Sequence, residues 1–308
     1  MTCRAASTKV LHEKPMSGSN AAYLDAAGQP RVRMSIVGFF DILGFSQSSL
    51  SCATTDDSQA VLDRISGAIR DARDFVRQAF SNDGVADAGR WALKFFSDNL
   101  SIGYPVDGSA DDYGQAASFL IRCAERYQLA MAMNGYFVRG ALTQGPICLT
   151  DEIIFGAALV ESYQLESKAS IVPRVVLTEP LQNAVVQTYR ERSETANPSR
   201  TICRDIDGWW FVNYLQAAEE PHGIQWHLIE RHKASILKSL SQATRHDVLP
   251  KFGWAARYHN VFCHWHRDDP GYSDKYRIDR VDEHSTIHRL EEFLDGSSPC
   301  SELDLLQQ

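Results

Sequence analysis

The stretch MSIVGFFDILGFS, residues 34–46, decides how the first part of this chain folds. Residues 34–40 are β-branched, aromatic and almost continuously apolar, which is typical of a strand buried on both faces of a sheet. Asp41 ends this run, at a place where an acid has no packing role, and capping of the next turn explains it equally well. The following residues predict a tight turn whose N–H groups bind an anion: Ile42, Leu43, Gly44, Phe45 and Ser46.

Working outward, hydrophobic periodicity predicts further helices and strands along the rest of the chain. Helices are expected over 56–80, 111–133 and 155–169, and strands over 91–96, 100–104, 136–144 and 174–178. A hairpin is expected over 204–215, then helices over 231–240, 246–264 and near 285–294. This order predicts an α+β fold, an antiparallel sheet with helices on one face.

Three regions follow from these patterns. Residues 1–33 lack periodicity and are interpreted as a flexible or loosely docked arm. Residues 34–224 form the expected central domain, and residues 225–308 a C-terminal helical extension.

Composition limits the class of protein. The 308 residues are 44% hydrophobic and 23% charged, which is ordinary for a soluble globular chain. We expect no membrane span, no secretory signal and, at a net charge of −8, no nucleic-acid partner. Seven scattered cysteines without a CxxC motif indicate reduced thiols and a cytoplasmic location.

Three charged residues are candidates for chemistry. Asp98, in LKFFSDNLSIGYP, is by itself a turn residue between two strands. Together with Asp41 it offers two carboxylates at adjacent strand ends, which can hold two divalent cations for phosphoryl chemistry. Arg139, in FVRGALTQGPI, needs a partner if buried: either a phosphate or an acid such as Glu161 or Glu166.

Four segments, in the same order, resemble the signatures of class III nucleotide cyclases. They are FFDILGFS (39–46), KFFSDN (94–99), RGALTQGP (139–146) and FGAALVESYQLE (155–166). In the second segment Ser97 stands where the family usually has glycine. The resemblance covers somewhat less than half of the chain and implies a ferredoxin-like cyclase core in a homodimer with active sites at the interface.

The resemblance also implies roles for single residues. Asp41 and Asp98 match the two aspartates that bind Mn²⁺ or Mg²⁺, and the backbone of Ile42 shares in metal binding. Residues 42–46 match the segment around the phosphates. Arg139 matches a phosphate-binding arginine, and Lys94 matches the lysine that reads the base in adenylyl cyclases.

Three family positions differ here. The base-reading acid falls on Ile153, although Asp151 and Glu152 are next to it. The asparagine and arginine of the catalytic helix fall on Val160 and Gln164. Lys168, one helical turn after Gln164, is a candidate replacement cation, or simply a solvated helix residue.

These departures fit either an inactive cyclase-like domain or a divergent enzyme, and the presence of Asp41, Asp98 and Arg139 favours the divergent enzyme. The chain is most similar to the bacterial Pycsar pyrimidine cyclases, through DILGFS, SDN, the LExxA pattern at 165–169 and KFGWAARYHN at 251–260. That resemblance implies synthesis of cyclic UMP, or cyclic CMP, in antiphage defence, with a separate effector protein that binds the product. A purine cyclase and a catalytically silent nucleotide-binding or dimerisation module remain alternatives.

His259 and Cys263 have the i, i+4 spacing of zinc ligands on a predicted helix. A core or interface histidine is the preferred interpretation, because no second pair of ligands is evident. Trp209, Trp210 and Trp254 are interpreted as core or interface aromatics.

Overall fold

The computed structural model describes residues 20–45, 50, 52–83, 90–191, 200–243, 245–279, 281 and 287–290. Its first part contains η1 (Asn20–Tyr23), β1 (Arg33–Ile42), α2 (Thr55–Asp83), β2 (Ala92–Phe96), β3 (Asn99–Pro105), α3 (Ala110–Met133) and β4 (Val138–Leu149). Then follow β5 (Ile154–Phe155), α4 (Ala157–Lys168), β6 (Val175–Leu177), α5 (Glu179–Glu191), β7 (Ile202–Arg204) and β8 (Trp210–Val212). The remaining elements are η3 (Tyr214–Ala218), β9 (Glu219–Glu220), β10 (Gly223–Ile224), α6 (Trp226–Gln242), α7 (Leu249–Trp265), η4 (Asp274–Tyr276) and β11 (His288–Arg289).

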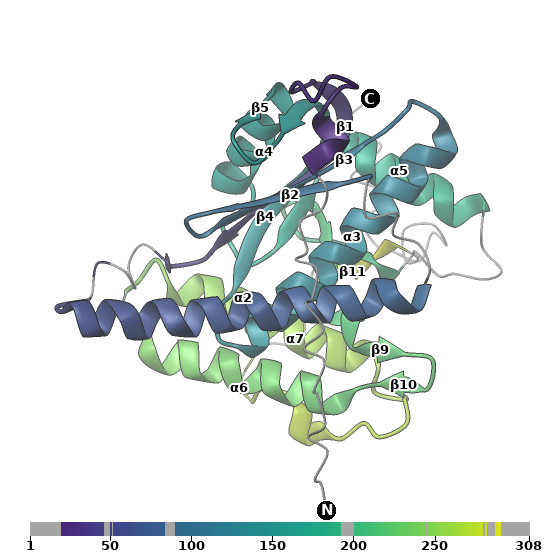
Figure 1. The fold of residues 1–308 in the computed structure, drawn as a ribbon. Coiled ribbons are helices and arrows are strands. Elements are labelled where there is room, and N and C mark those ends of the chain that lie inside the picture. Colours follow the sequence, from purple (N-terminus) through teal and green to yellow (C-terminus); the bar gives the residue numbers. More distant parts are fainter. Residues whose placement is uncertain are drawn as a thin grey trace, which may run out of the picture.

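One mixed sheet dominates the described part of the chain (Figure 1). Its strand order is β11-β7-β8-β6-β4-β1-β3-β2, and β5 pairs with β4. The stretch β4-β1-β3-β2 is antiparallel throughout, and helices α2 and α3 connect its strands. This is the split βαβ order of a ferredoxin-like fold, so the predicted fold class is confirmed.

Strand β1 lies in the middle of this sheet, between β3 and β4. Six consecutive residues, from Ser35 to Phe40, are buried. Successive side chains of a strand point to opposite faces, so a strand without polar alternation must be covered on both. The apolar run in the sequence therefore reports burial on two sides.

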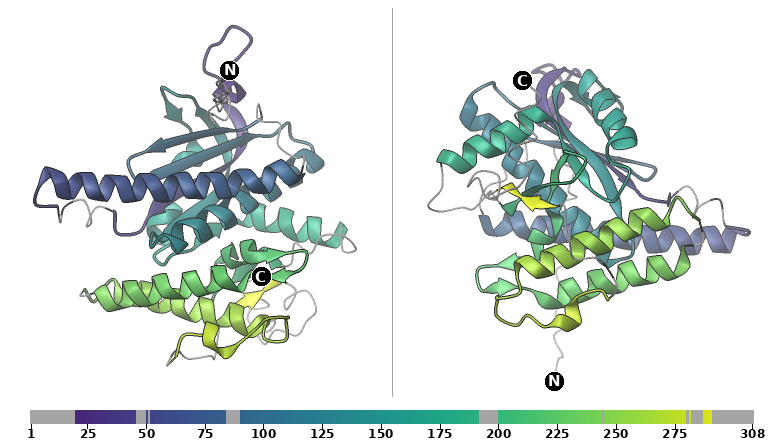
Figure 2. Two further views of the ribbon diagram at one scale, coloured as in Figure 1. Left: turned by 60° about the horizontal axis from the view of Figure 1, so that its bottom comes forward. Right: turned by 180° about the vertical axis from the view of Figure 1, so that it is seen from behind.

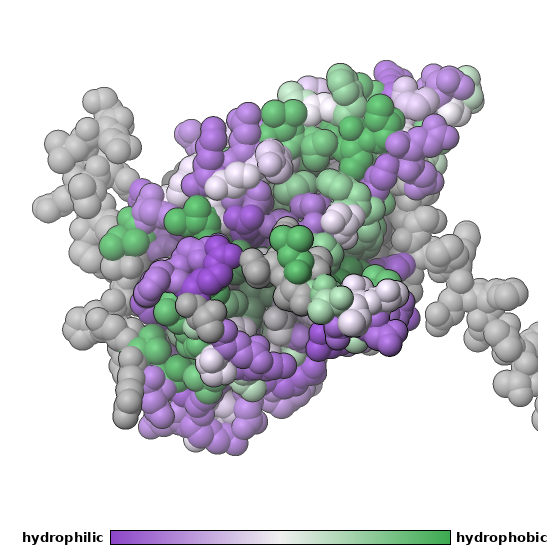
Figure 3. Space-filling model, turned by 90° about the vertical axis from the view of Figure 1, so that its left-hand side faces the viewer, coloured by the Kyte–Doolittle hydropathy of each residue, from purple (hydrophilic) through white to green (hydrophobic). Residues whose placement is uncertain are grey.

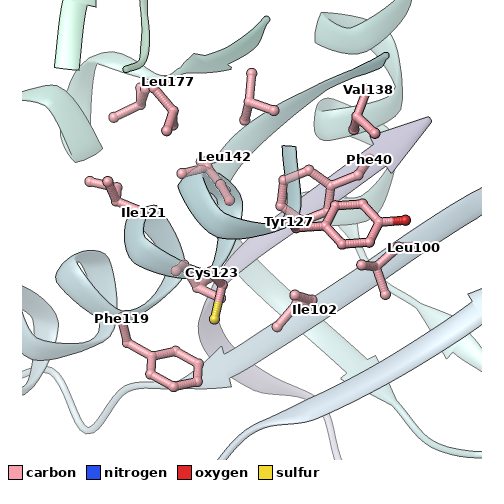
Figure 4. Close-up of a cluster of buried hydrophobic side chains, with 14 of the residues drawn as sticks. Phe40, Leu100, Ile102, Phe119, Ile121, Cys123, Tyr127, Val138, Leu142 and Leu177 are labelled. Atoms are coloured by element: carbon pink, nitrogen blue, oxygen red, sulfur yellow. The ribbon is translucent and has the colours of Figure 1, made fainter. Parts of the chain in front are cut away.

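The two faces of the sheet carry different helices. Ile36 and Phe40 belong to a core shared with α2, α3 and α5, part of which Figure 4 shows. Val37, of opposite orientation, belongs to a core with Ala158 of α4. Helices thus cover both faces, and the expectation of one covered face is wrong, because β1 is apolar on both sides and each side needs a cover.

Helices α6 and α7 lie side by side at one end of the molecule (Figure 2). They join the sheet through aromatic side chains: Phe211 of β8 meets Trp254 and Tyr258 of α7, with ring centroids 5.4 and 5.7 Å apart. The C-terminal helices therefore share a hydrophobic core with the sheet. None of the helices in the described ranges is long and apolar enough to cross a bilayer.

Several local predictions differ from the structure. Periodicity did not indicate α5. Residues 288–289 form β11, paired with β7, so a helix is wrong there, and residues 282–286 and 291–294 lie outside the described ranges. Residues 20–33 are docked, since Tyr23 is fully buried and donates a hydrogen bond to Ser35 Oγ at 2.8 Å. Residues 1–19 of the predicted arm are not described.

Candidate functional site

Asp41 lies near the end of β1, on the face of the sheet that carries α4. Across the two ladders it pairs with Asn99 of β3 and Arg139 of β4. Its side chain is 15% exposed. The strand thus brings a carboxylate to the rim of a buried sheet, where few waters solvate it.

Arg139 pairs with two acids. Its Nε donates a hydrogen bond to Asp41 Oδ2 at 3.0 Å, and its Nη2 lies 2.7 Å from Glu166 Oε1 of α4. The Glu166 side chain is only 4% exposed. Of the two kinds of partner left open for Arg139, the structure therefore provides the acid.

The surroundings shift the ionisation of Asp41. Burial raises its pKa to about 6, against the opposing effect of Arg139, and the charges of Glu166 and Asp98 raise it further. Asp41 and Glu166 thus share one guanidinium, and Asp98 lies close enough for its charge to act on Asp41. Carboxylate oxygens are the ligands that Mg²⁺ and Mn²⁺ prefer, and Asp41 and Asp98 would supply two of them, although no described group of three or more such side chains is arranged around one ion.

Asp98 lies in the turn between β2 and β3, next to the Asn99 that pairs with Asp41. Asn99 Nδ2 donates to Asp98 Oδ1 at 3.2 Å. Ser97 has a φ of +54°, in the left-handed region that glycine adopts at no steric cost, so the usual family glycine has a conformational reason. The structure thus brings the two predicted aspartates to adjacent strand ends.

The turn after Asp41 only partly fits the predicted anion cradle. The Leu43 N–H donates to Phe137 O at 2.8 Å, so this group is already used. Ile42 and Phe45 pack in the core, while Gly44 makes the turn with a φ of +80°. Ser46 lies outside the described residues. In this conformation the Leu43 N–H is therefore not available to bind an anion, although residues 42–46 were predicted to do so.

Lys94 lies in the middle of β2, opposite Ser101 of β3. By strand alternation it shares a face with Phe96, which is 40% exposed. Within the described part of the chain no carboxylate pairs with Lys94, and Asp151 and Glu152 are exposed. Among the described residues, no ion pair therefore joins Lys94 to an acid of the kind that would complete a purine-reading pair.

Lys168 does not reach the Asp41–Arg139 pair of its own chain. It is exposed in the last turn of α4, two residues after the buried Glu166, and residues i and i+2 point to different sides of a helix. It instead follows Val160 and Gln164 at intervals of four, on the outward side of the helix. The three positions therefore share one exposed stripe.

Exposed aromatic residues near the site were missed by the sequence analysis. Phe39 contacts Phe96 and Tyr163, with ring centroids 6.3 and 6.1 Å apart, and Tyr163 is 58% exposed. The position of Phe96, two residues after Lys94, was the available signal. Figure 3 shows hydrophobic side chains gathered in the upper part of the molecule, at the height of α4 and β5 in Figure 1.

His259 is a core residue, as preferred from the sequence. His259 Nε2 lies 2.8 Å from Tyr276 O, its Nδ1 lies 2.9 Å from His232 Nδ1, and Cys263 Sγ lies 3.7 Å away. The described residues contain no group of three or more histidine, cysteine, aspartate or glutamate side chains arranged to hold a metal ion. The zinc interpretation therefore has no support from the described ligands.

No protein-family model matches the chain, and no curated protein matches its sequence significantly. Among solved structures it is similar to the guanylyl cyclase Cya2, at a TM-score of 0.34 and 12% identity over 50% of this chain and 78% of that chain. An adenylate/guanylate cyclase/hydrolase from Silicibacter pomeroyi matches at 0.37 and 18%, over 59% and 98%. A class III adenylyl cyclase-like ATP-binding protein from Pseudomonas aeruginosa matches at 0.37 and 14%, over 56% and 40%. These TM-scores are too low to assign an activity to this chain.

Proposed function

We propose that this chain is a metal-dependent nucleotide cyclase that converts a pyrimidine nucleoside triphosphate, UTP rather than CTP, into its 3′,5′-cyclic monophosphate and pyrophosphate. The observation that carries the proposal is the meeting of Asp41, Asp98 and Arg139 at one end of the sheet. The four motif segments that resemble class III cyclases supply these residues in the family's order.

The reaction is an intramolecular phosphoryl transfer. The ribose 3′-oxygen forms a bond to the α-phosphorus, the bond from that phosphorus to the bridging oxygen breaks, and pyrophosphate leaves while the hydroxyl proton is lost to solvent. Protein groups contribute mainly position and charge. Two Mn²⁺ or Mg²⁺ ions, held by Asp41, Asp98 and the backbone of Ile42, would lower the pKa of the attacking hydroxyl and neutralise phosphate charge.

Arg139 has a defined part in this proposal. At rest it balances Asp41 and Glu166. A cation on Asp41 removes the need for that balance, and the guanidinium is then available to a phosphate oxygen, which it matches in geometry. Glu166 keeps the arginine oriented throughout.

The base specificity rests on Lys94. A purine cyclase of the usual kind has an acid beside this lysine, and in the described ranges no carboxylate pairs with it. This supports the pyrimidine assignment over the cyclic AMP or cyclic GMP alternative. Phe96 and Tyr163 supply exposed aromatic surface close by for the base.

We further propose a homodimer through the outward side of α4 and β5. Large apolar side chains are exposed there: Ile153 at 48%, Phe155 at 64%, Val160 at 56% and Tyr163 at 58%. Such a patch marks an interaction surface. In a dimer Lys168 of one chain would reach the site of the other, and the product would act on a separate effector in antiphage defence.

One alternative from another class has a specific observation in its favour. Val160 and Gln164 occupy the exposed helix positions where the family has its asparagine and arginine. A silent nucleotide-binding module would also show these replacements. It would bind a nucleoside triphosphate in the presence of Mn²⁺ without converting it to product.

Analysis of the reaction products distinguishes the pyrimidine cyclase from a purine cyclase and from the silent module. The purified chain is incubated with each of the four nucleoside triphosphates and Mn²⁺, beside Asp41→Ala, Asp98→Ala and, as a matched control, Asp71→Ala of an exposed residue on α2. Cyclic UMP or cyclic CMP that is lost in the first two variants only is expected. Cyclic AMP or cyclic GMP would overturn the base assignment, and nucleotide binding without product would favour the silent module.

A further inference from the structure

A cavity of about 510 Å³ opens at the other end of β1 from Asp41. It is lined by the chain that enters the strand, from Arg31 to Met34, and by Arg90 and the start of the segment after β3. Asp41 lies eight residues beyond Arg33, about 26 Å along an extended strand. The cavity therefore does not overlap the site described above.

The acids in this cavity wall are already engaged. Asp112 pairs with Arg90 and accepts the Asp107 N–H at 2.7 Å. Asp107 Oδ1 accepts the Ser109 N–H at 2.8 Å, and this hydrogen bond lowers the pKa of Asp107. These carboxylates are committed to holding the turn that leads into α3.

Arg31 and Arg33 carry positive charges that no described carboxylate neutralises. Among the described residues neither guanidinium pairs with a carboxylate, and the one hydrogen bond, from Arg33 Nη2 to Leu24 O, is long at 3.4 Å. Arg31 is exposed and Arg33 half-buried. Two arginines that line one cavity attract an anion, because the planar guanidinium group matches a carboxylate or phosphate in geometry.

The same cavity has an apolar wall. Val32 is 46% and Met34 52% exposed, and Pro105 and Val106 line the cavity beside them. Ligand sites of proteins have volumes of about 300–1,000 Å³ and combine apolar walls with a few polar groups. A bare inorganic ion would leave this apolar surface uncovered.

We propose that this cavity is a binding site for a small organic anion, whose carboxylate or phosphate is bound by Arg31 and Arg33 and whose apolar body extends around the end of β1 to Val32 and Met34, since Arg33 and Met34 point to opposite faces of the strand. The proposal does not depend on the cyclase activity. It needs only the cavity, the two guanidinium groups that pair with no carboxylate among the described residues, and the exposed apolar side chains.

Calorimetric titration of the full chain tests the site with defined probes: phenyl phosphate, 3-phenylpropionate, inorganic phosphate and the neutral benzyl alcohol. Phenyl phosphate or 3-phenylpropionate is expected to bind with a Kd of about 0.1 mM, a value reasonable for a ligand of this size. The better of the two identifies the head group. Inorganic phosphate should bind at least about tenfold more weakly, because it leaves the apolar wall uncovered.

Variants locate the binding. Arg31→Gln and Arg33→Gln should each weaken the better probe by about tenfold or more, while Arg257→Gln, an exposed arginine on α7, should leave it unchanged. Arg31 is exposed, so its variant is expected to keep the thermal unfolding midpoint of the parent. Equal binding of benzyl alcohol, unchanged affinity in both cavity variants, or no binding of either organic anion at roughly 10 mM would each overturn the proposal.

Discussion

Arg139 lies directly opposite Asp41 across the β1–β4 ladder, and its Nε donates a hydrogen bond to Asp41 Oδ2 at 3.0 Å. The same guanidinium contacts Glu166 from α4. One cation thus ties the end of the central strand to the helix above it. Any cation or phosphate that binds at Asp41 has to rearrange this contact, which makes it the natural place to test both stability and function.

Replacing Arg139 with Met should destabilise the fold by about 1–3 kcal/mol, because two poorly exposed carboxylates lose their counter-ion. A second change, Glu166→Gln, should restore part of that loss, since it removes one of the two stranded charges. Urea unfolding of the two single variants and the double variant measures this coupling. Additive effects would contradict the ion-pair network.

The same Arg139→Met variant should lower any cyclase activity by about 10²–10³, the usual cost of losing one group that stabilises transition-state charge. The comparison with Glu166→Gln separates the positioning of the Arg139 side chain from the effect of its positive charge. Glu166→Gln keeps the arginine and should therefore retain more activity than Arg139→Met. Equal losses in the two variants would argue against a direct phosphate contact.

Arg174 is the centre of a second ionic network, in which Arg174 and Asp205 are buried and Asp207 is 44% exposed. Its guanidinium is 1% exposed, pairs with Asp205 and Asp207 and donates to Ala169 O, after the end of α4, at 2.9 Å. Trp254 Nε1 of α7 donates to the same Asp205 at 2.7 Å.

We expect Arg174→Met to lower the free energy of unfolding by about 3–5 kcal/mol, because it leaves a buried carboxylate without its cation. Trp254→Phe removes one hydrogen bond and part of a buried ring, and should cost about 1–3 kcal/mol. Chemical denaturation of both variants checks the order. A larger loss in Trp254→Phe than in Arg174→Met would show that ring packing outweighs the ionic network.

The His232–His259 pair predicts a dependence of stability on pH. Tyr276 O only accepts hydrogen bonds, so His259 Nε2 carries a proton and donates to it. His232 Nδ1 then donates to His259 Nδ1, and His232 Nε2 accepts from the Tyr214 hydroxyl at 2.9 Å. Each donor finds an acceptor only when both rings are neutral.

Burial lowers the pKa of His259 to about 4, and it lowers that of His232 well below the usual range with help from the His259 charge. In the unfolded chain both have a pKa of about 6.5. Below that pH the unfolded state takes up protons that the native state refuses, so stability falls as the pH drops. The slope approaches ~1.4 kcal/mol per pH unit for each histidine.

Unfolding free energies between pH 7 and pH 5 measure this slope. His232→Gln should destabilise the chain at every pH but flatten its acid dependence. His227→Gln, an exposed histidine on the same helix, should leave the slope unchanged. An unaltered slope in His232→Gln would contradict the neutral pair.

The outward side of α4 predicts the oligomeric state. Val160→Glu places a charge in the apolar patch and should shift a homodimer toward monomer, as measured by sedimentation velocity. Leu62→Glu on α2 is a matched control, because Leu62 and Val160 are both 56% exposed. Equal behaviour of the two variants, or a parent chain that is monomeric at all concentrations, would exclude this interface.

Short-range sequence patterns predicted several helices, strands and turns of this protein. The apolar run ending at Asp41, the helix over α3 with its Asn134–Gly135 end and the turn at Asp207–Gly208 all follow from short-range periodicity and turn chemistry. Those patterns act within a few residues, so they predict the element and the order of elements. The ferredoxin-like strand order then follows from the split βαβ connection.

Only the tertiary structure decided which distant side chains meet. Arg139 and Asp41 are 98 residues apart, and their contact depends on the register of β1 and β4 together with the rotation of α4 that brings in Glu166. The cover on the second face of the sheet and the cavity beside Arg31 arise in the same way. Their energies depend on long-range packing, which sequence periodicity does not encode.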